Sequence, residues 1–396
     1  MLLACTCMLL HGCKSDDPIE NPEPEPPIEN PDDNKEPTLS LDVPDKEGYN
    51  VKGIVYCDNK PVEGAVMSDG ITVTTTDANG HYYLNSDKKN GYVFISIPSG
   101  YSVNNVGIYP QFYKTISSNI NKTDKANFSL VANDKKEHVV LALADMHLAK
   151  RNEDIAQFNK LVIPHINSTI AGYKATGKDV YCITLGDQSW DAYWYSNNYK
   201  LEEAMSEIEK LKAPVFNCLG NHDNDPYYAD DFDSETVWRK KLGPTYYSFN
   251  IGDIHYVVLD NILYKNKGAS VGTVGDRSYD GTITDKQMKW LEEDLAQIKD
   301  KNIPVVVCMH VQMFNKLQAD ANGNVDISYR LTNADGLAAL LKPFADVRVL
   351  TGHTHYNFTV IDPNSNIIEY NTAAICASWW LTGRSVFARR NICKDR

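Results

Sequence analysis

The sequence predicts an α/β domain with a layered β-sheet core flanked by helices, preceded by a small all-β sandwich domain. Its 396 residues are enough for two folded units. Residues 45–132 contain short stretches of alternating β-branched and aromatic residues between Asp-Gly and Asn-Gly turns, as in a β-sandwich. Residues 138–382 contain near-continuous apolar stretches of strand length, with helical spacing of apolar residues between them. That alternation indicates an α/β domain.

The first element of the chain is the apolar stretch "MLLACTCMLLHGC", which is too short to span a bilayer and ends at Cys13. It resembles a bacterial lipoprotein signal. The resemblance implies that residues 1–13 are a signal segment and that a lipid anchor on Cys13 attaches the protein to a membrane. It also implies a location in the cell envelope, with the outer-membrane surface of a Gram-negative bacterium as one candidate. A cytoplasmic protein with an unusual N-terminus is the alternative.

Residues 14–44 are rich in proline and acidic residues, so we expect a disordered, extended tether. Between residues 14 and 47 there are twelve acidic side chains and three lysines, and this stretch supplies most of the formal net charge of −13. The rest of the chain is only mildly acidic. That balance argues against the binding of long nucleic acid.

The α/β domain has six predicted strands, with predicted helices between them that include 201–212 and 285–300. The strands are 137–145, 179–187, 213–221, 254–261, 303–310 and 347–353. All six end in Asp, Asn or His, and five of them lead into groups of candidate donors. In an open α/β sheet, ligands bind beyond the carboxyl ends of the strands, so we expect these side chains to line one cleft. Turn chemistry alone does not call for histidine.

The strand ends carry a set of donors that suits metal ions. They are Asp145-Met146-His147, Gly186-Asp187, Asn221-His222-Asp223, His310 and Gly352-His353-Thr354-His355. Imidazole, carboxylate and amide donors together suit manganese, iron or zinc, whereas calcium prefers oxygen alone. The candidates outnumber the ligands of one ion, so the sequence predicts two divalent or trivalent ions that share a bridging carboxylate.

The blocks DxH, GDxx, GNHD, a single His and GHTH occur in this order. With them, residues 138–382 resemble the calcineurin-like metallophosphoesterase family. The preceding sandwich resembles the transthyretin-like, carboxypeptidase-regulatory type of domain carried by a bacterial branch of that family. The resemblance implies a metallophosphoesterase-type fold and a metal-dependent phosphoric ester hydrolase. It also implies a ligand set: Asp145, His147 and His355 for one ion, Asn221, His310 and His353 for the other, and Asp187 bridging both.

The resemblance further implies a mechanism in which a metal-bound hydroxide attacks phosphorus. His222 would act as the general acid that protonates the leaving oxygen, and Asp223 would orient its ring. In many relatives the second block reads GDxxD, whereas this chain has "GDQSWD". We therefore expect Trp190 to pack against the site, and we expect no direct role for Asp191.

Aromatic residues crowd the loops after the metal-binding blocks. They either contact the organic part of a substrate or belong to the core. We predict that Trp194 or Trp379 contacts the substrate, which would be a phosphate ester of a small molecule or a glycan. Arg277, in a glycine-rich segment, either meets a phosphate or lies on a solvated loop.

Two other functions remain open from the sequence. A nucleotide phosphodiesterase would use the same metal core, and the lack of a basic stripe does not count against nucleotides. A non-catalytic surface lipoprotein would bind glycan through its β domain and carry a vestigial phosphatase fold. That second alternative predicts missing metal ligands, whereas this sequence retains all seven.

The tail and the cysteines give two further expectations. Residues 383–396 are basic and lack the strand pattern expected of the family's C-terminal region, so the tail is either truncated or belongs to a branch without that region. Six cysteines after Cys13 lack CxxC spacing, and we expect free buried thiols instead of disulfides or a zinc knot. They are Cys57, Cys182, Cys218, Cys308, Cys376 and Cys393.

Overall fold

The computed structural model describes residues 39–315, 330–376 and 380. All of them belong to one compact unit that starts at Leu39. The predicted signal segment 1–13, most of the predicted tether 14–44 and the tail 383–396 lie outside the described residues. The lipid anchor on Cys13 and the envelope location therefore stay predictions. In the part of the chain that the structure describes, no helix combines the length and apolar character needed to cross a bilayer.

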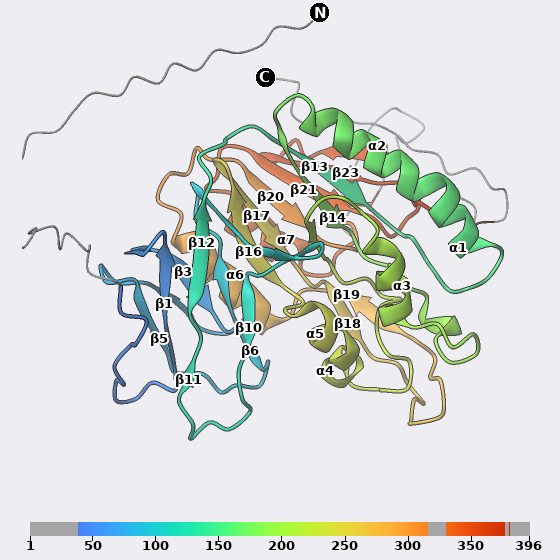
Figure 1. Cartoon of the computed structure of the whole chain (residues 1–396). Coiled ribbons are helices and arrows are strands. Elements are labelled where there is room, and N and C mark those ends of the chain that lie inside the picture. The colour runs from blue at the N-terminus through green and yellow to red at the C-terminus, as the bar shows by residue number, and fades with distance from the viewer. Residues whose placement is uncertain (1–38, 316–329, 377–379, 381–396) are drawn as a thin grey trace, which may run out of the picture. The chain divides into compact units, whose positions relative to one another are not determined.

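The first part of the described chain forms an all-β domain, as predicted (Figure 1). Its strands are β1 (Val51–Cys57), β2 (Lys60–Pro61), β3 (Val66–Ser68), β4 (Val73–Thr75), β5 (His81–Leu84), β6 (Tyr92–Ser96), β7 (Tyr101–Val103), β8 (Asn105–Val106), β9 (Tyr109–Pro110), β10 (Tyr113–Thr115), β11 (Asp124–Lys125) and β12 (Phe128–Ala132). One sheet has the order β11-β1-β12-β7, with β2 and β5 also paired to β1, and another has the order β10-β6-β3-β4. In β12, buried Phe128 and Leu130 alternate with exposed residues, which is the predicted period of a strand with one buried face.

The second part contains two larger sheets. Its strands are β13 (His138–Leu143), β14 (Asp179–Thr184), β15 (Val215–Phe216), β16 (Tyr247–Ile251), β17 (Ile254–Val258), β18 (Ile262–Tyr264), β19 (Tyr279–Gly281), β20 (Val305–Cys308), β21 (Val347–Thr351), β22 (Phe358–Ile361) and β23 (Ile367–Asn371). A parallel sheet has the order β13-β14-β15, and a mixed sheet has the order β16-β17-β20-β21-β23-β22. The strands β17, β20, β21 and β23 are parallel, while the two edges pair antiparallel. Strands β18 and β19 form a separate hairpin.

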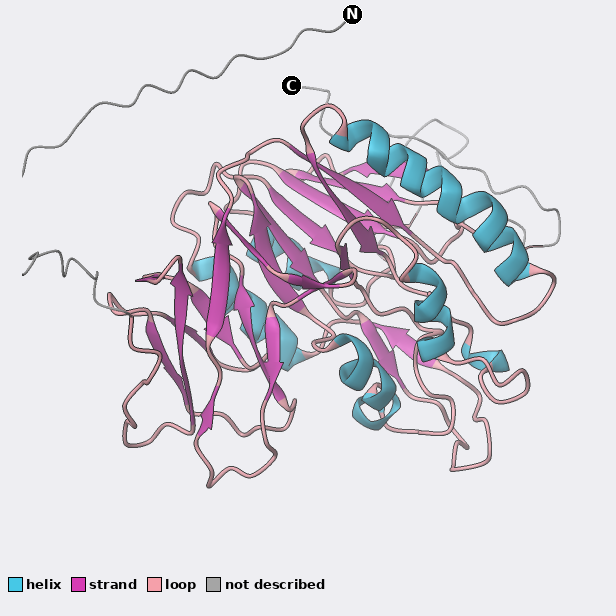
Figure 2. Cartoon of the chain, in the orientation of Figure 1, coloured by secondary structure: helices cyan, strands magenta, loops and turns pink. Residues whose placement is uncertain are grey.

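Helices lie outside these sheets, and the strands form the layers between them (Figure 2). The helices are α1 (Asp154–Gln157), α2 (Ile163–Lys174), α3 (Leu201–Ile208), α4 (Asp231–Ser234), α5 (Thr236–Leu242), α6 (Asp285–Ala296) and α7 (Ala334–Leu341), with a π-helical turn at Phe158–Val162 and a 3-10 turn, η2, at Asp191–Tyr193. In β14, Cys182 packs in one buried cluster with Ile166 of α2. Its neighbour Ile183 packs in the other cluster with Trp290 of α6 and the six-stranded sheet. Because neighbouring strand residues face opposite ways, the layers run helix, sheet, sheet, helix.

The β domain and the α/β domain share one hydrophobic core. Ile97, just after β6, forms a β-bridge with Phe249 of β16. The backbone N–H of Asn250 donates to the carbonyl of Ile97 at 2.8 Å, and the hydroxyl groups of Ser248 and Ser96 lie 2.8 Å apart. One buried cluster contains residues of both domains. The β domain is therefore built onto the sheet edge of the α/β domain.

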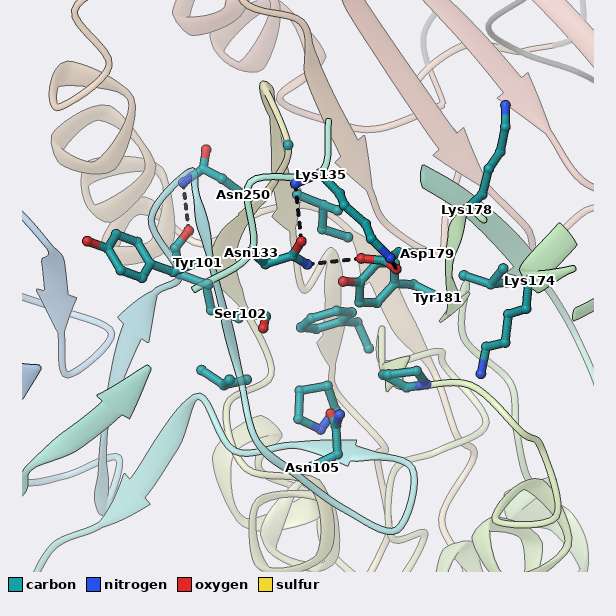
Figure 3. Close-up of a pocket in the computed structure, with 18 of the residues that line it drawn as sticks. Tyr101, Ser102, Asn105, Asn133, Lys135, Lys174, Lys178, Asp179, Tyr181 and Asn250 are labelled. Carbon is teal, nitrogen blue, oxygen red and sulfur yellow. Dashed lines mark hydrogen bonds and ion pairs between the residues drawn. The ribbon is translucent and has the colours of Figure 1, made fainter. Parts of the chain in front are cut away.

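The junction of the two domains also encloses a cavity of about 420 Å³ near the start of β14, which we call the junction cavity (Figure 3). Lys135 on its wall pairs with Asp179 at 2.9 Å, and Lys178 pairs with Glu137 at 3.2 Å. Asp179 also accepts a hydrogen bond from Asn133 at 3.0 Å. These charged groups are bound to other groups of the protein.

One predicted strand, 213–221, is much shorter than expected. Beyond β15, side chains replace the neighbouring strand as hydrogen-bond partners. The N–H of Asn217 donates to the Tyr247 hydroxyl at 2.8 Å, and the N–H of Cys218 donates to the Thr184 hydroxyl at 3.1 Å. The chain thus leaves the sheet early, and the third motif block lies on a loop.

Candidate active site

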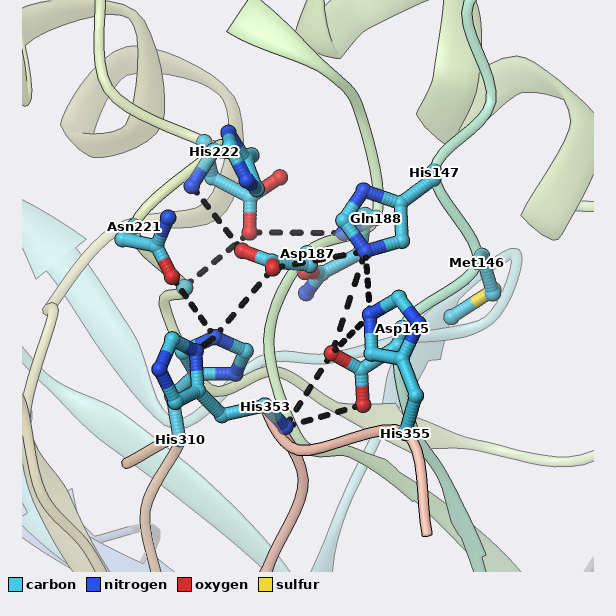
Figure 4. Close-up of polar contacts among 12 residues, drawn as sticks. Asp145, Met146, His147, Asp187, Gln188, Asn221, His222, His310, His353 and His355 are labelled. Atoms are coloured by element: carbon cyan, nitrogen blue, oxygen red, sulfur yellow. Dashed lines mark hydrogen bonds and ion pairs between the residues drawn. The ribbon is translucent and has the colours of Figure 1, made fainter. Parts of the chain in front are cut away.

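The seven predicted metal ligands converge where the carboxyl ends of the two α/β sheets meet (Figure 4). The ligands that follow the three-stranded sheet are Asp145, His147, Asp187 and Asn221, and those that follow the six-stranded sheet are His310, His353 and His355. The expectation of one cleft at the strand ends holds. The predicted layered β-sheet core is confirmed, because the strands divide into two stacked sheets whose carboxyl ends meet.

Asp145, His147 and His355 form the first group of donors. The Nε2 atoms of His147 and His355 are 3.0 Å apart. Asp145 Oδ1 lies 3.5 Å from His355 Nε2 and 3.9 Å from His147 Nε2. The Asp145 carboxylate also accepts the backbone N–H of His353 at 3.0 Å, which holds it in place. Atoms about 3–4 Å apart have the separation of neighbouring ligands on one ion, since each metal bond is about 2 Å long.

Asn221, His310 and His353 form the second group. His310 Nε2 lies 3.0 Å from Asn221 Oδ1 and 3.2 Å from His353 Nδ1. His310 Nδ1 lies 2.7 Å from the carbonyl of Leu185, to which it can only donate. Nε2 is therefore the nitrogen that is left to bind a metal ion.

Asp187 lies between the two groups. Its Oδ2 is 3.2 Å from His310 Nε2 and 3.5 Å from His147 Nε2. Its Oδ1 accepts the backbone N–H of His222 at 2.9 Å, which fixes the carboxylate. This placement fits the bridging role that the sequence predicts for it.

Five of the seven candidate ligands have a left-handed backbone. The φ angle is 53° at Asp145, 46° at His147, 55° at Asp187, 67° at His353 and 63° at His355. Residues other than glycine adopt this conformation rarely, and it costs about 1–3 kcal/mol per residue. Such strain persists where the surrounding structure enforces it, and it gathers at functional sites.

Glycine precedes the ligand in the second and third blocks because the chain segments approach closely there. A Cβ on Gly220 would lie 2.2 Å from the backbone nitrogen of Asp187. A Cβ on Gly186 would lie 2.3 Å from Nδ1 of His310. The Gly-Asp and Gly-Asn pairs of the motifs thus let the ligands of different strands come together.

The electrostatics of the site call for added positive charge. Burial raises the pKa of Asp145 to about 8. Although burial opposes it, the charge of Asp187 raises the pKa of His310 to about 9. Within the described ranges, the ion-pair partners of the Asp145 and Asp187 carboxylates are all histidines. Without metal ions, bound protons would balance the negative charge of the buried carboxylates. Metal ions would supply the same positive charge in place of these protons.

The donor set fits a pair of transition-metal ions. Asp187 belongs to two compact groups, one with His147 and His222 and one with His310 and His353, in which one donor atom of each residue lies within 4.8 Å of the others. Imidazole nitrogens combined with carboxylate and amide oxygens suit manganese, iron or zinc. The geometry therefore agrees with the predicted dinuclear site and does not select the metal.

His222 lines a cleft of about 270 Å³ beside these groups, which we call the metal cleft. The other lining residues are Asp187, His353, Thr354, His355 and Tyr356. The His222 side chain is 21% exposed, and its Nδ1 lies 2.7 Å from Asp191 Oδ1. Nε2 is therefore the nitrogen available to a substrate. Burial opposes it, but the charges of Asp187 and Asp191 raise the pKa of His222 and so favour the protonated form that a general acid needs.

Asp191 orients His222, and the prediction that Asp223 does so was wrong. Asp223 is fully buried and accepts the backbone N–H groups of Gly220 at 3.0 Å and Ser189 at 2.9 Å. Its carboxylate turns back onto its own loop, where it ties the second block to the third. Asp223 is next to His222 in the sequence, but its side chain does not contact the His222 ring.

The expectation that Asp191 has no direct role was also wrong. The side chain is buried, and its Oδ1 also accepts from Arg277 Nη1 at 3.0 Å while its Oδ2 accepts from the Tyr264 hydroxyl at 3.2 Å. Arg277, which is one-third exposed, thus joins the site through this carboxylate. An acid stands one residue later than in GDxxD, and the turn η2 that begins at Asp191 directs it toward His222. An acidic residue one position after the expected Asp was the feature of the sequence that could have identified Asp191.

The predicted substrate contact at Trp194 was wrong, because this side chain is completely buried and its Nε1 donates to the Ser189 hydroxyl at 3.1 Å. Trp194 belongs to the core, which was the alternative. Trp379 lies outside the described residues. Trp190 packs against the site as predicted, with its ring edge-on to His147 at 5.3 Å.

Tyr356 is a residue of the metal cleft that the sequence analysis missed. It follows the last motif block directly, and it is 71% exposed on the cleft wall. Its large aromatic side chain remains exposed beside a cluster of buried donors. Its position immediately after His355 was the signal that could have identified it.

Two family models match the chain. Residues 49–133 match the N-terminal domain of calcineurin-like phosphoesterases, and residues 138–357 match the calcineurin-like phosphoesterase domain itself, which is more than half of the chain. The chain belongs to the calcineurin-like phosphoesterase family. This is the family that the motif blocks resemble, and the β domain matches the N-terminal domain of that family. The family typically binds a dinuclear metal site.

Two curated proteins are similar to this chain over part of their length. The manganese-dependent ADP-ribose/CDP-alcohol diphosphatase of Arabidopsis thaliana is 24% identical, over 41% of this chain and 60% of its own. A probable cyclic nucleotide phosphodiesterase of Fibrobacter succinogenes is 24% identical, over 42% of this chain and 62% of its own. The chain thus spans about three-fifths of each relative.

Solved structures of related chains show more distant similarity. A dimetal phosphatase from Danio rerio is 13% identical with a TM-score of 0.41, over 60% of this chain and 88% of its own. A purple acid phosphatase from yellow lupin is 16% identical with a TM-score of 0.36, over 64% of this chain and 46% of its own. These values add nothing to the family assignment.

Proposed function

We propose that this phosphoesterase hydrolyses small phosphate esters with two metal ions held by the seven convergent side chains and with His222 as the general acid. One observation carries the proposal. Asp187 Oδ2 lies within 3.5 Å of ring nitrogens from both donor groups, and the cleft beside it holds a histidine whose Nδ1 is fixed by a buried aspartate. That arrangement provides two metal positions and a proton donor within one cleft.

The side chains divide the work of such a reaction. Bound ions would supply Lewis-acid stabilisation of the phosphoryl oxygens and an activated water. Asp191 fixes the His222 ring so that Nε2 can donate its proton to the leaving oxygen. Arg277 offsets part of the Asp191 charge, and burial of the Asp191 carboxylate limits the competition of water for its bonds.

The cleft supports a substrate with a ring system next to the phosphate. Tyr356 offers an exposed aromatic face at the cleft wall. Trp190 packs beside His147, and the guanidinium of Arg151 lies 4.8 Å from the centre of the Trp190 ring. Aromatic faces suit a base or a sugar ring. The small volume of the cleft, about 270 Å³, favours a small molecule over a polymer.

A nucleotide diphosphatase or phosphodiesterase is the second candidate within this reaction class. The exposed Tyr356 favours it, and so do the two relatives, whose names specify ADP-ribose and CDP-alcohol or cyclic nucleotides. A non-catalytic glycan-binding protein with a vestigial phosphatase fold is disfavoured. All seven donors are present, and the fold brings them together on strained backbone that a vestigial site would have no reason to keep.

The test is hydrolysis by the full chain after removal of metal and reloading with manganese, zinc or iron. The panel contains an aryl phosphate, the matching bis-aryl phosphate, ADP-ribose and a cyclic nucleotide. We expect activity that disappears with a chelator and returns with one or more of the metals. The preferred ester separates a monoesterase from a diesterase. A folded protein that binds no metal and cleaves none of the panel would contradict the proposal.

A further inference from the structure

Cys376 lies beside the first donor group, although no motif in the sequence pointed to it. The residue follows β23 and is completely buried. Its backbone N–H donates to the carbonyl of Asp145 at 3.2 Å, and the N–H of Ile375 donates to the carbonyl of Ala144 at 2.9 Å. Two consecutive hydrogen bonds thus hold the Cys376 segment alongside the first motif block.

The thiol is part of a compact group of donors. Cys376 Sγ, one ring nitrogen of His147 and one ring nitrogen of His355 all lie within 4.8 Å of one another. In a tetrahedral zinc site two ligand atoms lie about 3.3–3.6 Å apart, because a Zn–N bond is about 2.0–2.1 Å long and a Zn–S bond about 2.3 Å. Side-chain shifts of up to about 1.2 Å would therefore bring all three atoms to the same ion.

The other cysteines of the described chain differ in this respect. Cys57, Cys182, Cys218 and Cys308 are also free and buried, as the spacing in the sequence predicted. Among the cysteines that the structure describes, Cys376 is the one that belongs to a group of possible metal donors. Cys376 packs in the buried cluster of Met146 and Trp380, as thiols in protein cores commonly do, and it lies against two imidazole donors as well.

We propose that Cys376 is a further ligand of the first metal ion, beside Asp145, His147 and His355. The inference rests on the proposed dinuclear site and extends it. Sulfur selects zinc or iron over manganese or magnesium. The second position, formed by Asn221, His310 and His353, has oxygen and nitrogen donors alone. The two positions are therefore unequal, and the first is the one that prefers a thiophilic ion.

The primary test uses the wild-type full chain and needs no variant. X-ray absorption at the zinc edge should show a sulfur scatterer at about 2.3 Å in protein loaded with zinc. Cobalt(II) loading should give the intense near-ultraviolet absorption of a sulfur-to-cobalt charge transfer. A protein with two bound zinc ions and no sulfur scatterer would overturn the inference.

Cys376→Ser and Cys57→Ser then form a matched pair of buried cysteine variants in the two domains. In Cys376→Ser the charge-transfer band should vanish, and zinc affinity at the first position should fall by about tenfold or more. Manganese affinity should remain close to that of the wild type. Cys57→Ser, in β1, should keep the band. A band that survives in Cys376→Ser would overturn the inference.

Metal content and aryl phosphate hydrolysis separate this inference from the proposed function. Two bound ions and turnover without a sulfur signal remove Cys376 as a ligand and leave the proposed function intact. A folded chain that binds no ion removes both. A sulfur signal with bound metal supports the ligand role even where the aryl ester proves to be a poor substrate.

Discussion

The junction cavity and the metal cleft lie at opposite ends of β14 and differ in what their charged side chains contact. The junction cavity, near Asp179, is the larger, with about 420 Å³ against 270 Å³. Its Lys135 and Asp179 form an ordinary ion pair at 2.9 Å. In the metal cleft, Asp187 and the surrounding ring nitrogens face one another at 3.2–3.5 Å, and several of these residues have a left-handed backbone.

Charge and backbone strain therefore distinguish the metal cleft from the junction cavity better than volume does. Paired charges on relaxed backbone need no ligand, because the protein already satisfies them. Buried carboxylates that face only histidines, on backbone that costs energy to maintain, call for a further positive charge. The junction cavity follows from the packing of two domains, while the metal cleft requires an added ligand. The four predictions below test that distinction.

The largest effect is expected from Asp187→Asn, which removes the bridging charge and keeps the shape of the side chain. We expect kcat for an aryl phosphate to fall by at least about 10³-fold, because several kcal/mol of charge stabilisation is lost. Elemental analysis should show fewer than two ions per chain. Asp179→Asn, at the other end of the same strand, is the matched control and should leave both quantities unchanged. Full metal content with normal turnover in Asp187→Asn would contradict the bridging role.

His222→Ala should give the next largest effect, and the effect should depend on the leaving group. An alkyl phosphate needs a proton on its leaving oxygen, so we expect its kcat to fall by about 10²–10⁴-fold. An aryl phosphate with an acidic leaving group should lose much less. Both ions should stay bound, because His222 is not among the predicted ligands. Equal losses for the two esters would show that His222 does not act as the acid.

Asp191→Asn should shift the pH dependence of kcat with a smaller loss of rate. Asp191 helps to raise the pKa of His222, although burial opposes it. A general acid must carry its proton, so activity falls as the pH rises through this pKa. Without the Asp191 charge the pKa falls, and the alkaline limb of the profile should move to lower pH. Asp225→Asn is the control, because its carboxylate accepts from Tyr195 and not from His222.

The convergence of the candidate metal ligands was predictable because each lies within a few residues of a strand that the local apolar pattern reveals. Asp145, Asp187 and His310 lie two or three residues beyond the ends of their strands, so the strand pattern alone brings their backbones to the same edge. The family model and the fold agree with that part of the analysis.

Side-chain direction in the turns was not predictable in the same way. Asp191 and Asp223 both lie near His222 in the sequence, and the choice between them depends on how two turns rotate. The side chains of two nearby tryptophans also point in different directions. Trp194 turns into the core, whereas Trp190 packs on the site. A linear pattern carries no information on these rotations, which are decided by contacts between distant segments.

Contacts that depend on strand register could not be predicted from the sequence either. Strand β23 pairs with β21 so that Asn371 lies opposite Thr351. That register sets the segment after β23 beside the first motif block, where Cys376 meets His147 and His355. The sharing of one core by the two predicted domains has the same origin, since it depends on the pairing of Ile97 with Phe249.

Lys135→Ala, in the junction cavity, should have the smallest effect. Lys135 is 55% exposed, so the pair with Asp179 is screened by solvent. We expect the free energy of unfolding at neutral pH to fall by less than about 1 kcal/mol. Although burial opposes it, the hydrogen bonds from Lys135 and Asn133 lower the pKa of Asp179 below 3.8. The contribution of the pair to the free energy of unfolding should therefore be fully present above 3.8, the ordinary pKa of the group. It should disappear as the pH falls through the lowered pKa of Asp179.

Denaturant unfolding of the wild type and Lys135→Ala at neutral and at acidic pH measures this contribution, and a double variant with Asp179→Asn isolates the pair. The kcat of all these variants should equal that of the wild type, because the junction cavity lies at the far end of β14 from Asp187. A clear fall in kcat would mean that the two ends of the strand are coupled. The junction cavity would then belong to the functional machinery, and the comparison of the two cavities would fail.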